Sequence, residues 1–270
     1  MRHVSSPSLG NGSGTDEVDV ARRFSGLDRL VGVGSAELVR RAHVTVVGIG
    51  GVGSWAAEAL ARSGVGRLTL IDMDHVAESN INRQVHALST TTGKSKIIAM
   101  QERIALINPA CDVTCVDAFV EPDNWPSILP AGVDATIDAC DQVKSKAAMA
   151  AWARHTKHLF VSVGAAGGKR HAHQVDIADL SAVTHDPLLA QLRYRLRKEH
   201  HAPREGKKIG VACVFSREPV SVPQSSCAVP MDSTLNCHGY GSLVTVTATF
   251  GMCAAGWVID KISSNNQIHA

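Results

Sequence analysis

The sequence lacks the features that mark several large classes of protein. Its seven cysteines include no C-x-x-C pair, so a structural zinc site built from four cysteines is not supported. Aromatic residues make up only 4% of the chain, and a platform on which single-stranded bases would stack is therefore not evident. The formal net charge is only +2 over 270 residues. Such a balance does not by itself indicate nucleic acid as a partner, and any basic surface must be local.

Long apolar runs are also scarce. The stretch 243–259 is almost uncharged and contains several Thr and Gly residues. It is shorter than the roughly 20 residues that a membrane span needs, so we expect a buried helix there and no association with membranes. The cysteines are odd in number and no secretory signal precedes them, which favours a reducing compartment and a cytoplasmic location. Residues 1–18 are rich in Ser, Gly, Asn and Asp, and we expect a disordered tail.

The most informative segment, 43–72, has the pattern of a nucleotide-binding unit. The β-branched run 43–48 is typical of a buried strand, a glycine-rich turn leads into a helix over 54–63, and a second strand over 67–71 ends at Asp72. Glycines permit the tight turn and the close approach of the backbone to phosphate, and the amides at the start of the helix face an anion. A carboxylate after the second strand can accept hydrogen bonds from ribose hydroxyls. The segment predicts an adenine nucleotide bound at Gly48, Gly50, Gly51, Gly53 and Asp72.

Strands and helices alternate along the first half of the chain. This alternation predicts an α/β fold with a Rossmann-like, doubly wound and mostly parallel sheet. Beyond residue 165 the order changes, and we expect a C-terminal mixed or antiparallel extension of the same sheet. We expect a single domain over 19–270, with a nucleotide half over about 19–165 and a substrate-side half over about 166–270. The further expected strands are 112–117, 134–138, 158–163, 171–177 and 209–215, and the expected helices are 93–107, 123–129, 144–156 and 187–200, with a crossing over 216–237 before the closing helix.

The loop after Asp72 carries more positive charge than a dinucleotide requires. A nicotinamide cofactor has only a pyrophosphate, which the glycine turn can hold, whereas a triphosphate carries far more negative charge. Arg83 offers a planar fork to phosphate oxygens, and Lys96 offers a point charge. Asp138 and Asp141 follow the fourth expected strand, where ligands collect in such sheets, and an acid there can hold Mg²⁺ against phosphate oxygens. The sequence therefore favours ATP with Mg²⁺.

Six short blocks follow one another in order over about a hundred residues. They are Gly48-x-Gly-Gly-x-Gly53, Leu70-Ile-Asp72-Met-Asp74, Ser79-Asn-Ile-Asn-Arg-Gln84, Gly93-Lys-Ser-Lys96, Ile107-Asn-Pro109 and Ile137-Asp-Ala-Cys-Asp141. Together they resemble the superfamily of adenylating enzymes that activate ubiquitin-like proteins and sulfur carriers. Within this superfamily the chain is most similar to the bacterial dehydratases that cyclise threonylcarbamoyladenosine in tRNA, and the similarity covers nearly the whole chain past the tail.

The resemblance implies a role for each matched residue. Asp72 would bind the ribose, and Asn80 would support the nucleotide loop. Arg83 and Lys96 would bind the phosphates, and Asp141 would serve the metal and the reacting phosphate. Arg83, Lys96 and Asp141 would therefore form the catalytic set, with ATP and Mg²⁺ as cofactors.

The implied reaction is an ATP-dependent dehydration of threonylcarbamoyladenosine next to the anticodon. The threonyl carboxylate would join AMP and expel pyrophosphate, and the ureido nitrogen of the same side chain would then attack the acyl adenylate and release AMP. Proximity would supply much of this second step, and no covalent enzyme nucleophile is obligatory. In this superfamily an arginine near the N-terminus reaches into the partner subunit's ATP site. Arg23 is the candidate for that arginine, which implies a homodimer.

Other interpretations stay open. The chain could be an adenylyltransferase that activates the C-terminus of a sulfur-carrier or ubiquitin-like protein, although it lacks the C-x-x-C pairs of the sulfur-carrier activators. It could instead be a nicotinamide-binding redox protein, or a scaffold that passes sulfur between partners. Cys237 could accept sulfur from a sulfur-transfer protein, and Cys227 is a weaker candidate. A cysteine is more often a small buried residue than a sulfur acceptor.

The segment 193–208 is the one local basic run of note. It has seven Lys or Arg residues against two Glu. Such a run could neutralise RNA phosphates, so that binding of tRNA would weaken with salt. The alternative is a solvated helix face without a partner.

Overall fold

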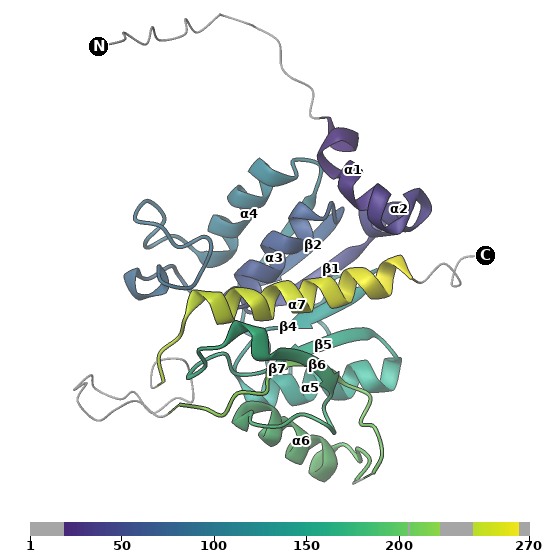
Figure 1. The fold of residues 1–270 in the computed structure, drawn as a ribbon, viewed down its shortest axis with the longest axis vertical. Helices are drawn as coiled ribbons and strands as arrows, with labels where there is room; N and C mark the ends of the chain where they lie inside the picture. Colours follow the sequence, from purple (N-terminus) through teal and green to yellow (C-terminus); the bar gives the residue numbers. More distant parts are fainter. Residues whose placement is uncertain (1–18, 205, 222–239, 265–270) are drawn as a thin grey trace, which may run out of the picture.

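A computed structural model describes residues 19–204, 206–221 and 240–264 of the chain. They contain a seven-stranded sheet in the order β3-β2-β1-β4-β5-β7-β6, with helices on both faces (Figure 1). Neighbouring strands are parallel except β6, which pairs antiparallel with β7. The predicted α/β fold with a mixed C-terminal extension is therefore confirmed. The strands are β1 (His43–Val47), β2 (Arg67–Ile71), β3 (Asp112–Val116), β4 (Ala135–Asp138), β5 (Leu159–Val163), β6 (Val175–Asp179) and β7 (Ala212–Ser216).

The strand order reverses beside β1. The chain runs outward from β1 to β2 and β3, and then returns to place β4 on the other side of β1. The register pairs Val47 with both Ile71 and Asp138, so that the carboxyl ends of three strands meet at one edge of the sheet. Such a reversal opens a crevice outside the carboxyl ends of the strands, and this crevice is where open α/β sheets bind ligands.

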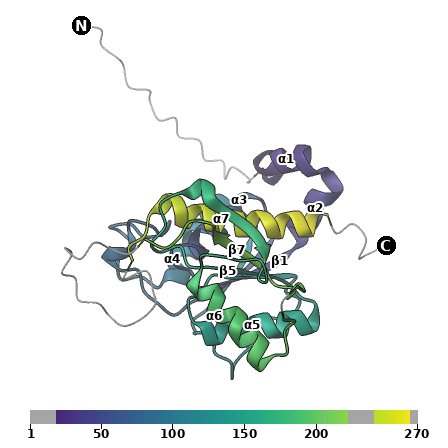
Figure 2. The same ribbon diagram turned by 60° about the horizontal axis from the view of Figure 1, so that its bottom comes forward.

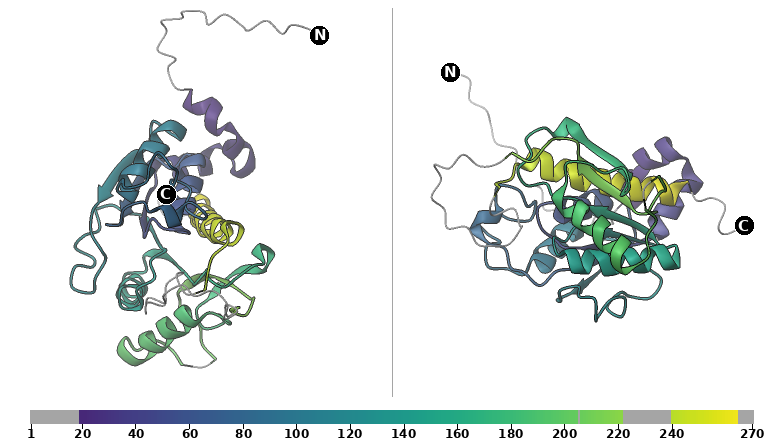
Figure 3. Two further views of the ribbon diagram at one scale, coloured as in Figure 1. Left: turned by 90° about the vertical axis from the view of Figure 1, so that its left-hand side faces the viewer. Right: turned by 90° about the horizontal axis from the view of Figure 1, so that it is seen from below.

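Helices bury one apolar cluster on each face of the sheet. Leu60, Met100 and Phe250 belong to the cluster under α3, α4 and α7, whereas Met149 and Leu192 belong to the cluster under α5 and α6. Figures 2 and 3 show α7 on the opposite side of the sheet from α5 and α6. The helices are α1 (Val20–Val31), α2 (Val33–Arg41), α3 (Gly53–Arg62), α4 (Lys96–Ile107), α5 (Val143–Thr156), α6 (Pro187–Glu199) and α7 (Val244–Ser263).

The closing helix α7 lies directly against α3. A side-chain carbon at Gly251 would be 2.5 Å from the carbonyl oxygen of Val52 and 2.8 Å from the amide of Ala56, so only glycine permits this approach. The contact brings the start of α7 beside the glycine turn, where Thr247 lies 3.5 Å from the position of a side-chain carbon on Gly51. Within the described ranges, no helix combines the length and the apolar character that crossing a membrane requires.

The helices α1 and α2 have no counterpart among the expected elements. Each contains a glycine, Gly26 or Gly34, and glycine lowers the intrinsic helix propensity of a segment. The break between them is at Gly32, whose φ of +86° is in the left-handed region. The side chain of Asp19 caps α1 by accepting a 2.9 Å hydrogen bond from the amide of Arg22.

The expected helix over 123–129 is wrong, because this segment forms turns. The side chain of Asn124 accepts a hydrogen bond from the amide of Glu121 and donates one to the carbonyl of Phe119, which holds the backbone in a turn. Helix α4 begins at Lys96 rather than at 93, since Gly93 has a φ of +85° that a helix does not allow.

Two strands begin later than expected. β6 begins at Val175 rather than at 171, because the carboxylate of Glu218 binds the amides of Arg170 and His171 and a short 3₁₀ turn, η2 (Ala172–Gln174), follows. β7 begins at Ala212 rather than at 209. The amides of Ile209 and Gly210 donate to the carboxylate of Asp179 instead of to a neighbouring strand. The expected tail and most of the expected crossing lie outside the described residues, and so do Cys227 and Cys237.

Candidate nucleotide site at the carboxyl edge of the sheet

The glycine turn after β1 packs against the residues that follow β4. Gly48 has a φ of +84°, and a side-chain carbon there would be 2.9 Å from the carbonyl oxygen of Ala139. A side-chain carbon at Gly53 would be only 1.8 Å from the carbonyl oxygen of Gly48. These two glycines are therefore required by the turn itself. At Gly51 a side chain would instead meet Arg83, whose Cδ lies 3.3 Å away, while at Gly50 the nearest atom is Nε2 of Gln84 at 4.0 Å.

Asp72 lies beside this turn at the end of β2. Its Oδ2 accepts a 2.6 Å hydrogen bond from the amide of Ile49, and its Oδ1 accepts a 2.8 Å hydrogen bond from the amide of Asp74. Burial raises the pKa of Asp72, and the positive charge of Lys96 opposes this effect. Each carboxylate oxygen has a second lone pair, so the side chain can still accept hydrogen bonds from a ribose.

The loop between β2 and α4 folds back over the glycine turn. Asn80 is buried, and its Oδ1 accepts a 3.0 Å hydrogen bond from the amide of Ala77, which holds the short helix η1 (Glu78–Asn80) in place. The guanidinium of Arg83 donates to the carbonyl of Ser79 at 2.7 Å, and the carbonyl of Arg83 accepts from the indole of Trp55 on α3 at 2.9 Å. Arg83 is thus fixed against the turn and is half-buried.

Lys96 is the first residue of α4, and its positive charge acts on Asp72 beside the glycine turn. Its Nζ is 2.7 Å from Oδ2 of Asp74, and its side chain is only 8% exposed, whereas that of Asp74 is 54% exposed. The amide of Lys96 also donates to the carbonyl of Asp74, so the backbone and the side chain are held together. The structure therefore brings Asp72, Asn80, Arg83 and Lys96 together around the glycine turn.

Asp138 and Asp141 differ sharply in their surroundings. Asp138, at the end of β4, is fully buried and forms an ion pair with Lys146 at 2.9 Å, which occupies the carboxylate that a metal would need. Asp141 is exposed at the same edge. No cluster of three or more His, Cys, Asp or Glu side chains that could hold a metal occurs in the described part of the chain. One exposed carboxylate fits Mg²⁺ that takes its other ligands from phosphate oxygens and water.

Arg23 lies away from this site within its own chain. Its Nη1 donates to the carbonyl of Ile107 at 2.8 Å, at the end of α4 opposite to Lys96. Because α4 has 12 residues, the two ends of this helix are about 18 Å apart. Together with Arg62 and Arg103, Arg23 borders an open cavity of about 500 Å³.

Several residues that shape the site carry no signal in the sequence. Trp55 reads as one more apolar residue of a helix, yet its indole donates to the carbonyl of Arg83 beside the glycine turn. His86 is buried under the loop, and neither ring nitrogen has a hydrogen-bond partner among the described residues. Burial lowers the pKa of His86 to about 4, so its imidazole is neutral near pH 7.

The fold and the site together define a Rossmann-like protein with a cationic loop over its glycine turn. Residues 25–270 match the model of the ThiF family, and the chain belongs to that family. It is 46% identical over 243 residues to the tRNA threonylcarbamoyladenosine dehydratase of Haemophilus influenzae, covering 89% of this chain and 93% of that protein. It is also 46% identical over 250 residues to the enzyme of the same name from Escherichia coli K12, with the same two coverages. The crystal structure of E. coli tRNA N6-threonylcarbamoyladenosine dehydratase, TcdA, in complex with ATP superposes with a TM-score of 0.84 at 43% identity, covering 93% of this chain and 97% of that one.

Proposed function

We propose that this protein is an ATP-dependent dehydratase that cyclises threonylcarbamoyladenosine next to the anticodon of tRNA. The observation that carries this proposal is the 46% identity, over 89% of the chain, to proteins of that name. The ATP-bound relative of the same fold supports the use of ATP. We treat residues 19–270 as one catalytic domain, since one sheet runs through both halves of the described chain.

ATP would bind across the carboxyl ends of β1, β2 and β4. Asp72, whose carboxylate binds the amide of Ile49, would accept hydrogen bonds from the ribose, and the amides of the glycine turn would donate to phosphate. Arg83 and Lys96 supply two positive charges at this turn, which would neutralise the charge that develops on the reacting phosphate. Asp141 would hold Mg²⁺ against the phosphate oxygens, and bound Mg²⁺ would polarise them.

The reaction needs two steps and no enzyme nucleophile. An oxygen of the threonyl carboxylate attacks the α-phosphorus of ATP, pyrophosphate leaves, and an acyl adenylate forms. The ureido nitrogen then attacks the acyl carbon, the ring closes, and AMP leaves with the carboxylate oxygen, so that the nucleoside loses one water overall. The attacking nitrogen is in the same side chain as the acyl carbon, and such proximity lowers the barrier. Among the described cysteines, Cys140 is next to the site, but burial raises its pKa well above the usual range, so it carries no thiolate.

A homodimer would complete the site. Arg23 is distant from the nucleotide site of its own chain, and α1 and α2 expose Leu30 and Val33, which are 82% and 71% accessible. A partner subunit that covers this apolar surface would bring Arg23 to the partner's phosphates. A sulfur-transfer protein that acts through Cys237 would be a second partner, in addition to the tRNA. We place the protein in the cytoplasm with its substrate.

The tRNA would use the basic segment 193–208. The whole chain has 27 Lys and Arg against 25 Asp and Glu, and without this segment the balance is 20 against 23, so the positive charge of the protein is concentrated here. Arg193 and Arg197 are bonded to backbone carbonyls and Arg195 is paired with Glu199. The cations that remain exposed are Lys198, Arg204, Lys207 and Lys208, and the ammonium of Lys198 lies 5.6 Å from the ring centre of the exposed Tyr194. These four cations would make the affinity for tRNA fall as the salt concentration rises. Because the excess positive charge of the chain is in this segment, we favour a tRNA-binding role over a solvated helix face without a partner.

The decisive experiment is incubation of the protein with ATP, Mg²⁺ and threonylcarbamoylated tRNA, followed by mass spectrometry of the nucleosides. The expected result is the loss of one water from the modified nucleoside together with AMP formation. Pyrophosphate exchange that depends on a small carrier protein rather than on modified tRNA would instead support an activator of sulfur carriers. A melting temperature raised by NADH and not by ATP would support a redox protein.

A further inference from the structure

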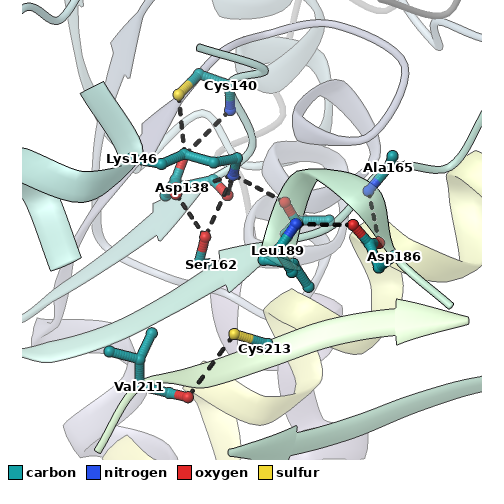
Figure 4. A network of polar contacts seen from close by, with 10 residues as sticks. Asp138, Cys140, Lys146, Ser162, Ala165, Asp186, Leu189, Val211 and Cys213 are labelled. Carbon is teal, nitrogen blue, oxygen red and sulfur yellow. Dashed lines mark hydrogen bonds and ion pairs between the residues drawn. The ribbon is translucent and has the colours of Figure 1, made fainter. Parts of the chain in front are cut away.

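The ends of β4 and β5 are joined by a fully buried ion pair. Nζ of Lys146, on α5, is 2.9 Å from Oδ2 of Asp138, and both side chains are 0% exposed (Figure 4). The same Nζ donates to Oγ of Ser162 at 3.2 Å and to the carbonyl of Val163 at 2.8 Å. The hydroxyl of Ser162 donates to Oδ2 of Asp138 at 2.6 Å. Each of the three ammonium protons therefore has an acceptor.

An ion pair in this position is not explained by stability alone. Withdrawing two charges from water is costly, and apolar side chains of similar size often give an equally stable core. Burial opposes the charged form of Lys146, but the carboxylate of Asp138 outweighs it and raises the pKa of the lysine. Lys146 is thus charged at neutral pH, and the pair lies at the edge of the sheet where the nucleotide site is built.

The second oxygen of Asp138 holds the turn that leads to Asp141. Oδ1 accepts hydrogen bonds from the amide of Cys140 at 3.3 Å and from its thiol at 3.0 Å. Ala139, within the same turn, donates its amide to the carbonyl of Val47 at 2.8 Å. Its carbonyl oxygen lies against Gly48. The turn is thus held by Asp138 on one side and by the glycine turn on the other, and Asp141 is the next residue after Cys140.

We propose that Asp138 and Lys146 are positioning residues that set the carboxylate of Asp141 relative to the glycine turn. This inference rests on the proposed function, because it concerns the metal and phosphate site of that reaction. Lys146 fixes Asp138 through contacts to two strands, Asp138 fixes the backbone of Cys140, and the backbone of Cys140 fixes Asp141. Neither member of the pair touches the reacting atoms.

The test separates positioning from stability by removing both charges together. Lys146→Met or Asp138→Asn alone leaves one charge buried without its partner, and each is expected to lower the melting temperature strongly. The double variant has neither charge, and we expect most of the melting temperature to return. Its kcat is still expected to be reduced by about tenfold or more, with an unchanged KM for tRNA, because the side chains around a metal ligand commonly contribute 10- to 100-fold.

A second readout does not depend on turnover. ATP should raise the melting temperature of the wild-type protein, and Mg²⁺ should add a further increment. In the double variant the shift with ATP alone is expected to persist while the Mg²⁺ increment is lost. Ser145→Ala is the matched control, because Ser145 is also a buried hydroxyl on α5 but donates to Val120. It is expected to keep both increments and the wild-type kcat.

The outcomes distinguish the two proposals. A double variant with a wild-type Mg²⁺ increment and wild-type kcat shows that the pair is only part of the core, and overturns the inference. If the double variant does not fold, Ser162→Ala takes its place, since it removes one hydroxyl from the pair, and an unchanged Mg²⁺ increment in Ser162→Ala overturns the inference equally. If wild-type protein fails to cyclise the nucleoside, the proposed function fails, while the melting shifts with ATP and Mg²⁺ still test the positioning.

Discussion

Oδ2 of Asp72 accepts a 2.6 Å hydrogen bond from the amide of Ile49, and this contact joins the end of β2 to the glycine turn after β1. The other oxygen of the same carboxylate accepts from the amide of Asp74, which begins the loop toward Lys96. One side chain therefore fixes the glycine turn and the loop toward Lys96 relative to each other. A substitution at Asp72 would change the geometry of both.

Asp72→Asn is expected to weaken ATP binding by about tenfold or more, since hydrogen bonds to a charged group contribute roughly 1.5 to 3 kcal/mol. Asparagine has only one oxygen, so its NH₂ group must face the amide of Ile49 or of Asp74, and two donors cannot bond to each other. The lost hydrogen bond should lower the free energy of unfolding by about 1 kcal/mol. Isothermal titration with ATP and urea unfolding measure the two effects. An unchanged ATP affinity would show that the ribose lies elsewhere.

Lys96→Ala is expected to abolish AMP formation and leave the fold intact. The ammonium of Lys96 pairs with Asp74 and acts on Asp72, whose carboxylate binds the amide of Ile49 in the glycine turn. In the proposed site the variant would lack one of the positive charges that neutralise the reacting phosphate. Lys94→Ala is the matched control, because Lys94 is two residues away and pairs with Glu102 on the surface of α4. The rate of AMP release with modified tRNA should be normal in Lys94→Ala. Equal rates in the two variants would place the phosphates away from Lys96.

The sequence predicts the nucleotide half of the site because its signals are local. The glycine spacing, the strand that ends at Ile71 and the acid after it are all read within thirty residues, and the structure has the same strand boundaries for β2. Lys146 gives no such signal, because a lysine in a helix normally lies on the solvent side. Its burial depends on the ends of β4 and β5 meeting above α5, and only the three-dimensional structure contains that information.

Asp141→Asn is expected to remove most of the AMP formation without lowering the melting temperature. Asp141 is exposed, so the loss of its charge should not affect the fold. The neutral amide is a poorer ligand for Mg²⁺ than a carboxylate. Titration of the rate with Mg²⁺ is the measurement, and the half-saturating concentration should rise. A variant with the wild-type Mg²⁺ dependence would exclude Asp141 as the metal residue.

His86 is expected to make the protein sensitive to mild acid. Its pKa falls from 6.5 in the unfolded chain to about 4 in the folded protein because the ring is buried. Below about pH 6.5 the unfolded state binds an extra proton, so the unfolding free energy falls as the pH is lowered toward 4. Between about pH 7.5 and about pH 5 the loss is roughly 2 kcal/mol. Urea unfolding of His86→Leu should show a smaller loss over this range, and an equal loss would mean that other groups cause the acid sensitivity.

Mixed dimers test whether Arg23 acts on the partner subunit. Arg23→Ala and Lys96→Ala should each be inactive alone. If Arg23 acts across the interface, a dimer with one copy of each variant has one complete site, formed by the intact Lys96 of one subunit and the intact Arg23 of the other. Random exchange of subunits should then restore about a quarter of the wild-type rate, because half of the dimers are mixed and each has one working site out of two.

An arginine that acts within its own chain gives no such recovery, since every site in the mixed dimer then lacks one of its two groups. Arg22→Ala is the control, because Arg22 is the exposed neighbour of Arg23 on α1, and it should be active without mixing. Within its own chain, the side chain of Arg23 donates one hydrogen bond, to the carbonyl of Ile107. Loss of this one surface contact should lower the melting temperature of Arg23→Ala only slightly. If Arg23→Ala is folded and inactive and mixing restores its activity, the site is shared between subunits.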